Sequence, residues 1–355
     1  MPPDNKSEPI KITLDDLARV ELDPPTPTLA PPIAGVAGGT KVYGTVNEPG
    51  TEPAVASQER GNLLLQAWFY LGLAGLLGAC AGWALAEPWF VDGPGRHWGN
   101  WAIIPLVITL ECIGFAIAES IVERSLKKAA LRGLLAFVLG TVLAFVFDFF
   151  AGIIFNLGIA IIVEAGVHSE KNPAFWIVRG IAWTVFGAAG GVVYGIVGQS
   201  SKKALYGALG GIIGACVGGM IFDPIAMLTH GGAASRGIGF SFVGLATGVA
   251  IGLVESALKD RWLYVTAGPL AGKQFILYKS RTVIGSDQRS DIYLFKDSNI
   301  MPQHAVIEIA GSRVQIRAAG PLFVSGSPTK LMVLQSGNLL QIGRYAFRYQ
   351  ERQRK

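Results

Sequence analysis

Six long apolar segments constrain the fold of this chain more than any other feature. They lie at about residues 62–86, 101–121, 131–150, 177–197, 204–223 and 236–257. Each is close to the ~20 residues that a helix needs to cross about 30 Å of hydrocarbon. All are too long and too uniformly apolar for strands or half-exposed helices. Charged residues make up only 15% of the chain, against about 25% in soluble domains. The sequence therefore predicts a multi-pass α-helical membrane bundle.

Composition divides the chain into three parts. Residues 1–60 hold ten of the nineteen prolines and nine Asp/Glu against five Lys/Arg, which predicts a disordered, Pro-rich acidic tail. Residues 61–259 form the membrane domain of about six helices. Residues 260–355 hold fourteen Lys/Arg against six Asp/Glu. Their short alternating apolar segments, separated by Gly, Ser, Pro and Asp, predict an all-β sandwich.

An internal repeat supports six spans rather than seven. The two matched rows are Arg179 with Gly187, Gly191 and Gly195, and Arg236 with Gly244, Gly248 and Gly252. A second match pairs Lys127-Lys128 with Lys202-Lys203, so the unit is a helical hairpin used about three times. Residues after Asp148 are then an insertion. They continue one long helix as an in-plane or re-entrant extension, or they form another span.

Basic residues predict the orientation of the bundle. Nine Lys/Arg flank one end of the six spans and four flank the other, and the richer side is expected in the cytoplasm. This places both termini in the cytoplasm and the protein in the cell membrane. Seven spans would move Lys202-Lys203 to the outer side and break the repeat.

Glycines spaced four residues apart predict closely packed helices, because they leave a flat face on which another backbone can rest. The alternatives for these rows are a narrow pore or the interface of a homo-oligomer.

Five ionisable residues lie in or beside the predicted spans: Glu111, Asp148, Arg179, Asp223 and Arg236. We expect Asp148 and Asp223 to end equivalent helices and to form ion pairs with the arginines that begin the next ones. Glu111 lies near mid-membrane, where a carboxylate is costly and is a candidate functional site. It either takes part in ion or proton transport or is hydrogen-bonded to Gln66 or Thr109.

The C-terminal segment carries a recognisable series of motifs. They are Val283-Ile284-Gly285-Ser286-Asp287, Ser290-Asp291-Ile292-Tyr293-Leu294, Asp297, His304-Ala305, Phe323-Val324-Ser325-Gly326, Leu339-Leu340-Gln341-Ile342-Gly343 and Phe347-Arg348-Tyr349. Over about residues 262–350 this series resembles the forkhead-associated (FHA) domain. The resemblance implies a β-sandwich that binds phosphothreonine peptides through loops at one end.

Three ligand-facing positions depart from the FHA pattern. The family has Arg where this chain has Ser286, Ser where it has Met301, and Asn where it has Ser325. Gly285, His304 and Gly326 keep the family pattern and are expected to shape the loops. A phosphate dianion needs Arg forks and hydroxyl or N–H donors, so Arg289 in the same loop is the candidate replacement, with Arg281 and Lys330 as further options.

The expected partners are a protein that is acidic or phosphorylated, the lipid bilayer and a second copy of the chain, with no nucleic acid. The four histidines are isolated, and the sequence has no Walker loop, kinase signature or Ser/His/Asp pattern. The three cysteines lie in apolar runs without metal-ligand spacing. We therefore expect no catalytic residues, no metal and no cofactor.

These features lead to two hypotheses about function. The first is a non-enzymatic membrane protein that presents a cytoplasmic FHA-like module for signalling or scaffolding. The alternative is a channel or transporter regulated by that module.

Overall fold

The computed structural model describes residues 62–93, 97–169 and 171–352, so the predicted acidic tail at 1–60 lies outside the described residues. The helical part consists of η1 (Leu63–Leu65), α2 (Ala67–Ala86), η2 (Glu87–Trp89), α3 (Trp98–Val122), α4 (Leu126–Glu164), α5 (Pro173–Val197), α6 (Ser201–Leu228) and α7 (Gly232–Leu258). Within the described part, six helices are long and apolar enough to cross a membrane.

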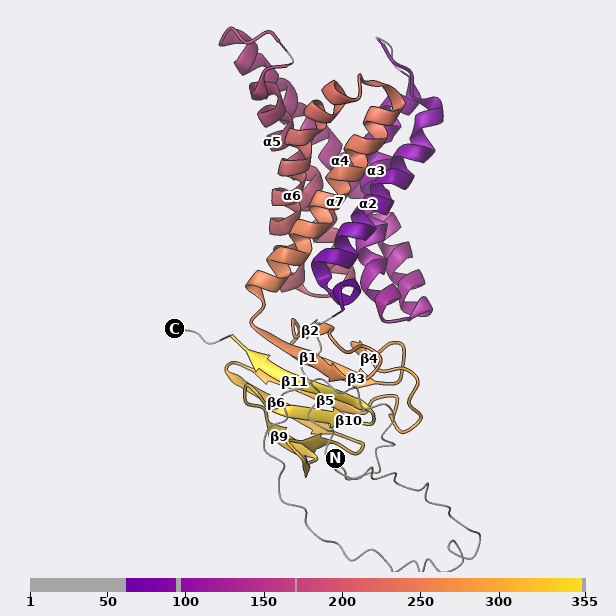
Figure 1. The fold of residues 1–355 in the computed structure, drawn as a ribbon, viewed down its shortest axis with the longest axis vertical. Helices are drawn as coiled ribbons and strands as arrows, with labels where there is room; N and C mark the ends of the chain where they lie inside the picture. The colour runs from indigo at the N-terminus through magenta and orange to yellow at the C-terminus, as the bar shows by residue number, and fades with distance from the viewer. Residues whose placement is uncertain (1–61, 94–96, 170, 353–355) are drawn as a thin grey trace, which may run out of the picture. The chain divides into compact units, whose positions relative to one another are not determined.

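The six long helices form a closed ring. Each packs against the next in the chain, and α7 packs back on α2 (Figure 1). Inside the ring, the fully buried ring of Phe115 lies against the backbones at Gly75 of α2 and Gly190 of α5. The bundle is therefore closed by apolar contacts between helices that are distant in sequence.

Two turns at the same end of the bundle share one geometry. Arg124 and Gln199 adopt left-handed φ values of 55° and 56°. The N–H of the next residue, Ser125 or Ser200, then donates to the carbonyl five residues earlier. This is the Schellman arrangement that ends a helix. The predicted hairpin repeat thus has a common turn, with a serine immediately before the next helix.

Glycine rows lie where helices cross most closely. A Cβ on Gly191 of α5 would lie 2.0 Å from the carbonyl oxygen of Gly207 on α6. One on Gly248 of α7 would lie 2.1 Å from the carbonyl oxygen of Leu71 on α2. Among the described residues, these glycine rows lie between helices of the same chain. They therefore pack the helices of one bundle closely against each other.

Helix α4 differs from expectation. It is one continuous helix of 39 residues from Leu126 to Glu164, without a break after Asp148. At 1.5 Å per residue it is about 58 Å long, so a tilted or protruding single helix replaces the expected re-entrant extension or extra span. Asp148 and Asp223 lie inside α4 and α6 and do not end them.

The C-terminal part is a sandwich of two sheets with the strand orders β2-β1-β11-β10-β7-β8 and β4-β3-β5-β6-β9 (Figure 1). The strands are β1 (Arg261–Ala267), β2 (Gln274–Ile276), β3 (Arg281–Gly285), β4 (Ile292–Tyr293), β5 (Ala305–Ala310), β6 (Arg313–Ala318), β7 (Phe323–Val324), β8 (Ser327–Pro328), β9 (Leu331–Val333), β10 (Leu339–Ile342) and β11 (Tyr345–Glu351). Only the β3–β4 pair is parallel among the paired strands of the described residues.

Alternating side chains form the core between the two sheets. On β11, Tyr345, Phe347 and Tyr349 are fully buried and belong to the core; of the residues between them, Arg348 is exposed, while the small Ala346 is also buried. A strand with one face buried in the core shows this alternation of buried and exposed side chains, because successive side chains point to opposite faces. The predicted all-β sandwich is confirmed.

The close crossing of α7 and α2 gives a first prediction. Gly248→Ala should lower the unfolding free energy of the full chain in detergent by about 1–3 kcal/mol, because the new methyl group forces two backbones apart. Gly152→Ala is the matched control, since nothing lies within 4 Å of its Cβ position in α4. Equal melting temperatures for the two variants would contradict the assigned crossing.

Candidate functional site

The loop face of the sandwich is formed by the β3–β4 loop (residues 286–291), the β4–β5 loop (residues 294–304) and the β7–β8 turn at Ser325-Gly326. Gly285 ends β3 where these loops meet, and a Cβ there would lie 2.0 Å from the carbonyl oxygen of Pro302. Only glycine allows this close approach. Gly285 therefore holds the first two loops together.

Ser286 braces the loop face. Its backbone N–H donates to the carbonyl of Met301 at 3.0 Å, and its hydroxyl donates to the carbonyl of Ile300 at 2.7 Å. A hydroxyl that already donates within the loop has no proton left for a phosphate oxygen. The structure thus places Ser286 next to Met301, as a structural residue of the loop.

His304 is buried and links three segments. Its Nδ1 accepts from the backbone N–H of Met301 at 3.2 Å, so its Nε2 is the nitrogen that donates to the carbonyl of Pro321, at 2.9 Å. A side chain that is 1% exposed and hydrogen-bonded at both nitrogens positions its neighbours. Because His304 is buried, exposed residues of the loop face would make the direct contacts with a ligand.

The exposed residues of the loop face include the predicted Arg289, Met301, Ser325 and Gly326, and also Asp287, Lys296, Ser298, Asn299, Pro302 and Gln303. The Arg289 side chain has no hydrogen-bond or ion-pair partner among the residues that the structure describes, while its backbone N–H is held by Asp287 Oδ1 at 3.0 Å. Ser325 and Gly326 adopt left-handed φ values of 48° and 84°. The face thus presents the free guanidinium of Arg289, the exposed Lys296 and an apolar Met301 that is 46% exposed.

A second cluster, the charge junction, lies at the end of the bundle that leads into the sandwich. It consists of Glu119, Glu123, Lys128, Arg132, Lys203 and Lys273. The two carboxylates come from the end of α3. Lys128 and Arg132 come from the first two turns of α4, and Lys203 comes from the first turn of α6. Lys273 comes from the β1–β2 loop of the sandwich.

The ion pair of Glu123 and Lys273 joins the two parts of the chain. Its Nζ–Oε1 distance is 2.8 Å, and both side chains are 2% exposed. Lys128 Nζ lies 3.3 Å from the other oxygen of Glu123 and also donates to the carbonyls of Ser290 and Asp291. Lys128 therefore connects the bundle directly to the β3–β4 loop of the loop face.

Glu119 forms the second half of the junction. Its Oε2 lies 2.9 Å from Lys203 Nζ and 3.0 Å from Arg132 Nη1. The Lys203 ammonium also lies over the ring of Tyr194, 4.1 Å from its centroid. Because each buried charge has an opposite partner, the cost of removing it from water is offset.

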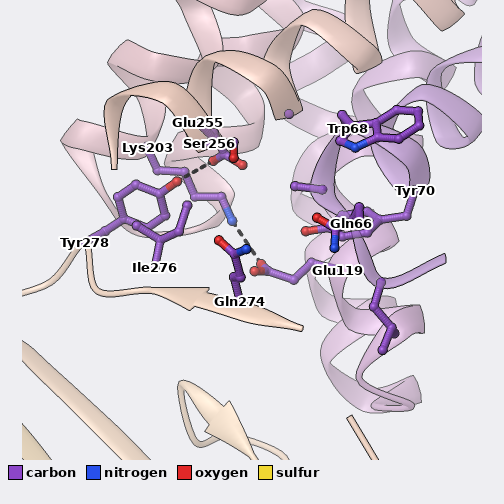
Figure 2. A pocket seen from close by; sticks show the side chains of 13 residues that line it. Gln66, Trp68, Tyr70, Glu119, Lys203, Glu255, Ser256, Gln274, Ile276 and Tyr278 are labelled. Atoms are coloured by element: carbon purple, nitrogen blue, oxygen red, sulfur yellow. Dashed lines mark hydrogen bonds and ion pairs between the residues drawn. The ribbon is translucent and has the colours of Figure 1, made fainter. Parts of the chain in front are cut away.

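A small polar cavity of about 40 Å³ adjoins Glu119 and Lys203. Figure 2 shows Glu255 beside it, whose carboxylate accepts from the hydroxyl of Tyr278 at 2.7 Å and from that of Tyr194 at 3.2 Å. Burial, followed by the negative charge of Glu255, raises the pKa of Tyr278 well above its ordinary value. Tyr278 thus stays a neutral donor that ties the sandwich to α7.

The ionisable residues predicted within the membrane are paired in part as expected. Arg179 forms its ion pair with Asp223, at 2.9 Å. Arg236 bonds to Glu87 and Asp92, two acids before α3 that the sequence analysis did not select. Arg179 and Asp223 thus form an ion pair between two of the predicted residues and join α5 to α6. Arg236 pairs with other acids, and Asp148 has no ion-pair partner among the described residues.

Glu111 is 7% exposed, and its Oε1 has no hydrogen-bond partner among the described residues. The expected bonds to Gln66 or Thr109 are therefore absent for that oxygen. Within residues 62–93, 97–169 and 171–352, no three His, Cys, Asp or Glu side chains come together as a metal site.

The charge junction is the main feature that sequence reasoning missed. In the sequence, Lys128 and Lys203 indicate only the hairpin repeat and the cytoplasmic side of the bundle. The sequence did contain a signal for this cluster. Glu119 and Glu123 are four residues apart before the tight turn, and Lys128 and Arg132 are four residues apart after it. Nothing in the sequence indicated that Lys273 would join them.

Fold and site together define a membrane-helix bundle followed by an FHA-type β-sandwich. Residues 264–353 match the family described as the inner membrane component of T3SS, cytoplasmic domain. The match falls on the sandwich and agrees with the FHA resemblance of its loop motifs.

Two curated proteins, from Corynebacterium efficiens and Corynebacterium glutamicum, are each described as an oxoglutarate dehydrogenase inhibitor. They are 34% and 33% identical over 86 residues, which are 23% of this chain and 60% and 59% of theirs. This chain therefore spans about 60% of the length of the curated relatives that it matches.

Solved structures with a similar fold include an FHA domain from Chlamydia trachomatis, at 27% identity, a TM-score of 0.25 and coverage of 27% of this chain and 100% of that one. Another is the cytoplasmic domain of the T3SS sorting platform protein PscD from P. aeruginosa. It is 23% identical with a TM-score of 0.24 and coverage of 27% and 83%.

The buried ion pair gives a second prediction. Lys273→Met should lower the unfolding free energy of the full chain by about 3 kcal/mol, because Glu123 loses one of its two cations inside the protein. Adding Glu123→Gln should recover most of this loss. The measurement is chemical or thermal unfolding in detergent, followed by tryptophan fluorescence.

Lys202→Met is the matched control for that variant. The Lys202–Asp260 pair has a distance of 3.4 Å and side chains that are 59% and 40% exposed, so its loss should cost less than about 1 kcal/mol. An equal effect of both lysine variants would mean that Lys273 and Glu123 are not a buried pair.

Proposed function

We propose that this protein is a non-enzymatic membrane scaffold that presents its FHA-type sandwich for protein–protein recognition. The observation that carries the proposal is the loop face, where an unpartnered Arg289 and an exposed Met301 lie on loops braced by Ser286 and His304. The T3SS inner-membrane description of the matched family favours a role within a multiprotein membrane assembly. We propose signalling through such an assembly as a second version of this recognition role.

The proposed location is the cell membrane, with both termini in the cytoplasm. Six successive helices bring the start of α2 and the end of α7 to the same end of the bundle. That end also carries Lys127, Lys128, Lys202 and Lys203, and an excess of Lys/Arg marks the cytoplasmic side. The loop face would then meet cytoplasmic proteins.

The proposed partner is a protein segment with acidic character, including a second copy of this chain as one candidate. A net positive sandwich attracts acidic segments, and Arg289 offers a free fork for a carboxylate or a phosphate. Ser286 donates within the loop, and Met301 has no strong donor. Recognition should therefore depend on phosphothreonine less than in domains that retain the family pattern.

Partner capture with the full chain in nanodiscs tests this function. We expect proteins enriched by the native chain to be lost at least about tenfold from an Arg289→Glu variant, which is about 1.4 kcal/mol of binding free energy. Phosphatase treatment of the extract should change capture by less than that factor.

Arg348→Glu is the matched control, because Arg348 is an exposed arginine of β11 outside the three loops. It should capture the same proteins as the native chain. Capture that survives Arg289→Glu, or that is lost equally in the control, would count against recognition by the loop face.

The alternative function is ion or proton transport, and one observation favours it. Glu111 is buried in a membrane-length helix without a hydrogen bond at Oε1, and intramembrane acids commonly mark ion pathways. Flux in liposomes that is lost on Glu111→Gln would support transport. Flux without dependence on Glu111 would leave this residue without a transport role.

A further inference from the structure

A second pocket, the headgroup pocket, lies apart from the loop face. Its volume is about 650 Å³. Its wall includes Lys202 in the first turn of α6, Arg261 at the start of β1, Lys279 after β2 and Arg352 after β11. The only acids in the wall, within the described residues, are Asp260 and Glu351.

The depth of this pocket is fixed by two membrane-length helices. Lys202 is the second residue of α6, and Asp260 follows the last residue of α7 by two positions. Arg352 Nη1 donates to the carbonyl of Ala257, in the last turn of α7, at 3.2 Å. The phosphate groups of a bilayer lie where spanning helices leave the hydrocarbon, so the pocket opens at headgroup depth.

An aromatic residue marks the same depth. Lys259 directly follows α7, and its ammonium lies 4.4 Å from the ring centroid of Trp262 on β1. Tryptophan is enriched where membranes meet water, and lysine side chains extend toward the headgroups there. The junction of α7 and β1 thus carries a lysine–tryptophan pair of the kind found at membrane interfaces.

Four cations and two carboxylates line the pocket, and Lys279 is already held by Asp291 at 2.8 Å, outside the lining. The pairs inside the lining are longer. Lys202 lies 3.4 Å from Asp260, and Arg261 Nε lies 3.4 Å from Glu351. The exposed Lys202–Asp260 pair contributes little, so an incoming phosphate can replace Asp260 at small cost. Arg261 is only 17% exposed and keeps its pair with Glu351. Arg352 uses only Nη1 for the backbone of α7, which leaves its other guanidinium donors available.

Hydroxyl groups complete the lining. Ser280 and Ser312 are exposed on the β2–β3 and β5–β6 connections. Within the described residues, neither hydroxyl makes a hydrogen bond to the protein. Hydroxyl donors beside a cationic cluster suit the polar part of a lipid headgroup, such as glycerol, next to its phosphate.

We propose that the headgroup pocket binds the phosphate of an anionic phospholipid, with Lys202 and Arg352 as its principal contacts. The lipid would bridge the first turn of α6 and the end of β11, and so hold the sandwich at the membrane surface. This assignment depends on the helices spanning a membrane and is independent of recognition at the loop face.

Native mass spectrometry of the full chain in detergent tests the assignment. Phosphatidylglycerol should be retained about tenfold more than phosphatidylcholine, since lysines and arginines near the membrane surface attract anionic headgroups. The Lys202→Ala/Arg352→Ala variant should lose this preference. The Arg313→Ala/Arg317→Ala variant removes two exposed arginines of β6 outside the pocket and should keep it.

Inorganic phosphate is the competing soluble ligand. Millimolar phosphate should not displace phosphatidylglycerol, because the pocket opens at the membrane. Equal retention of the two lipids, unchanged retention in the Lys202/Arg352 variant, or displacement by phosphate alone would overturn the lipid assignment. A melting temperature for each variant separates lost binding from lost folding.

Discussion

The arrangement of this protein depends on one buried ion pair, Glu123 with Lys273. An isolated charge in such surroundings costs several kcal/mol, and the pair is tolerated because each member has an opposite charge in contact. Apolar contacts could join the two parts in many orientations. A buried ion pair allows few orientations. A small displacement of the sandwich would separate the two charges and leave both unpaired where no water can solvate them. The pair therefore favours one position of the sandwich on the helices.

Lys128 extends that constraint to the loop face. It neutralises Glu123 and also donates to the carbonyls of Ser290 and Asp291. Asp291 in turn accepts from the backbone of Val283 and pairs with Lys279. The loop that carries Arg289 is thus anchored at its base by bundle residues, while its tip remains exposed. Such an arrangement suits a module whose ligand contacts are presented at a fixed place beside the membrane.

Sequence patterns predicted the parts of the structure that depend on local periodicity. The length of the apolar segments predicted six membrane helices. The alternation of apolar and polar residues in 260–355 predicted the sandwich. The sequence left open whether α4 continues past Asp148 or a second span begins there, because an acid in an apolar run resembles a helix end; the structure has one continuous helix. The pairing of Arg236 with Glu87 and Asp92 was missed, since ring closure of α7 on α2 decides it. The role of Lys273 was hidden for the same reason: its partner is 150 residues away in the chain.

Electron paramagnetic resonance distances across the junction test the central claim most directly. Spin labels at Lys127 and Arg348, both exposed, would report on the bundle and the sandwich in a chain whose three cysteines are replaced by alanine. The account predicts one narrow distance distribution in nanodiscs, which broadens when Lys273→Met removes the buried cation. A broad distribution in the unmodified junction, or an unchanged narrow one in Lys273→Met, would contradict the claim that this ion pair positions the sandwich.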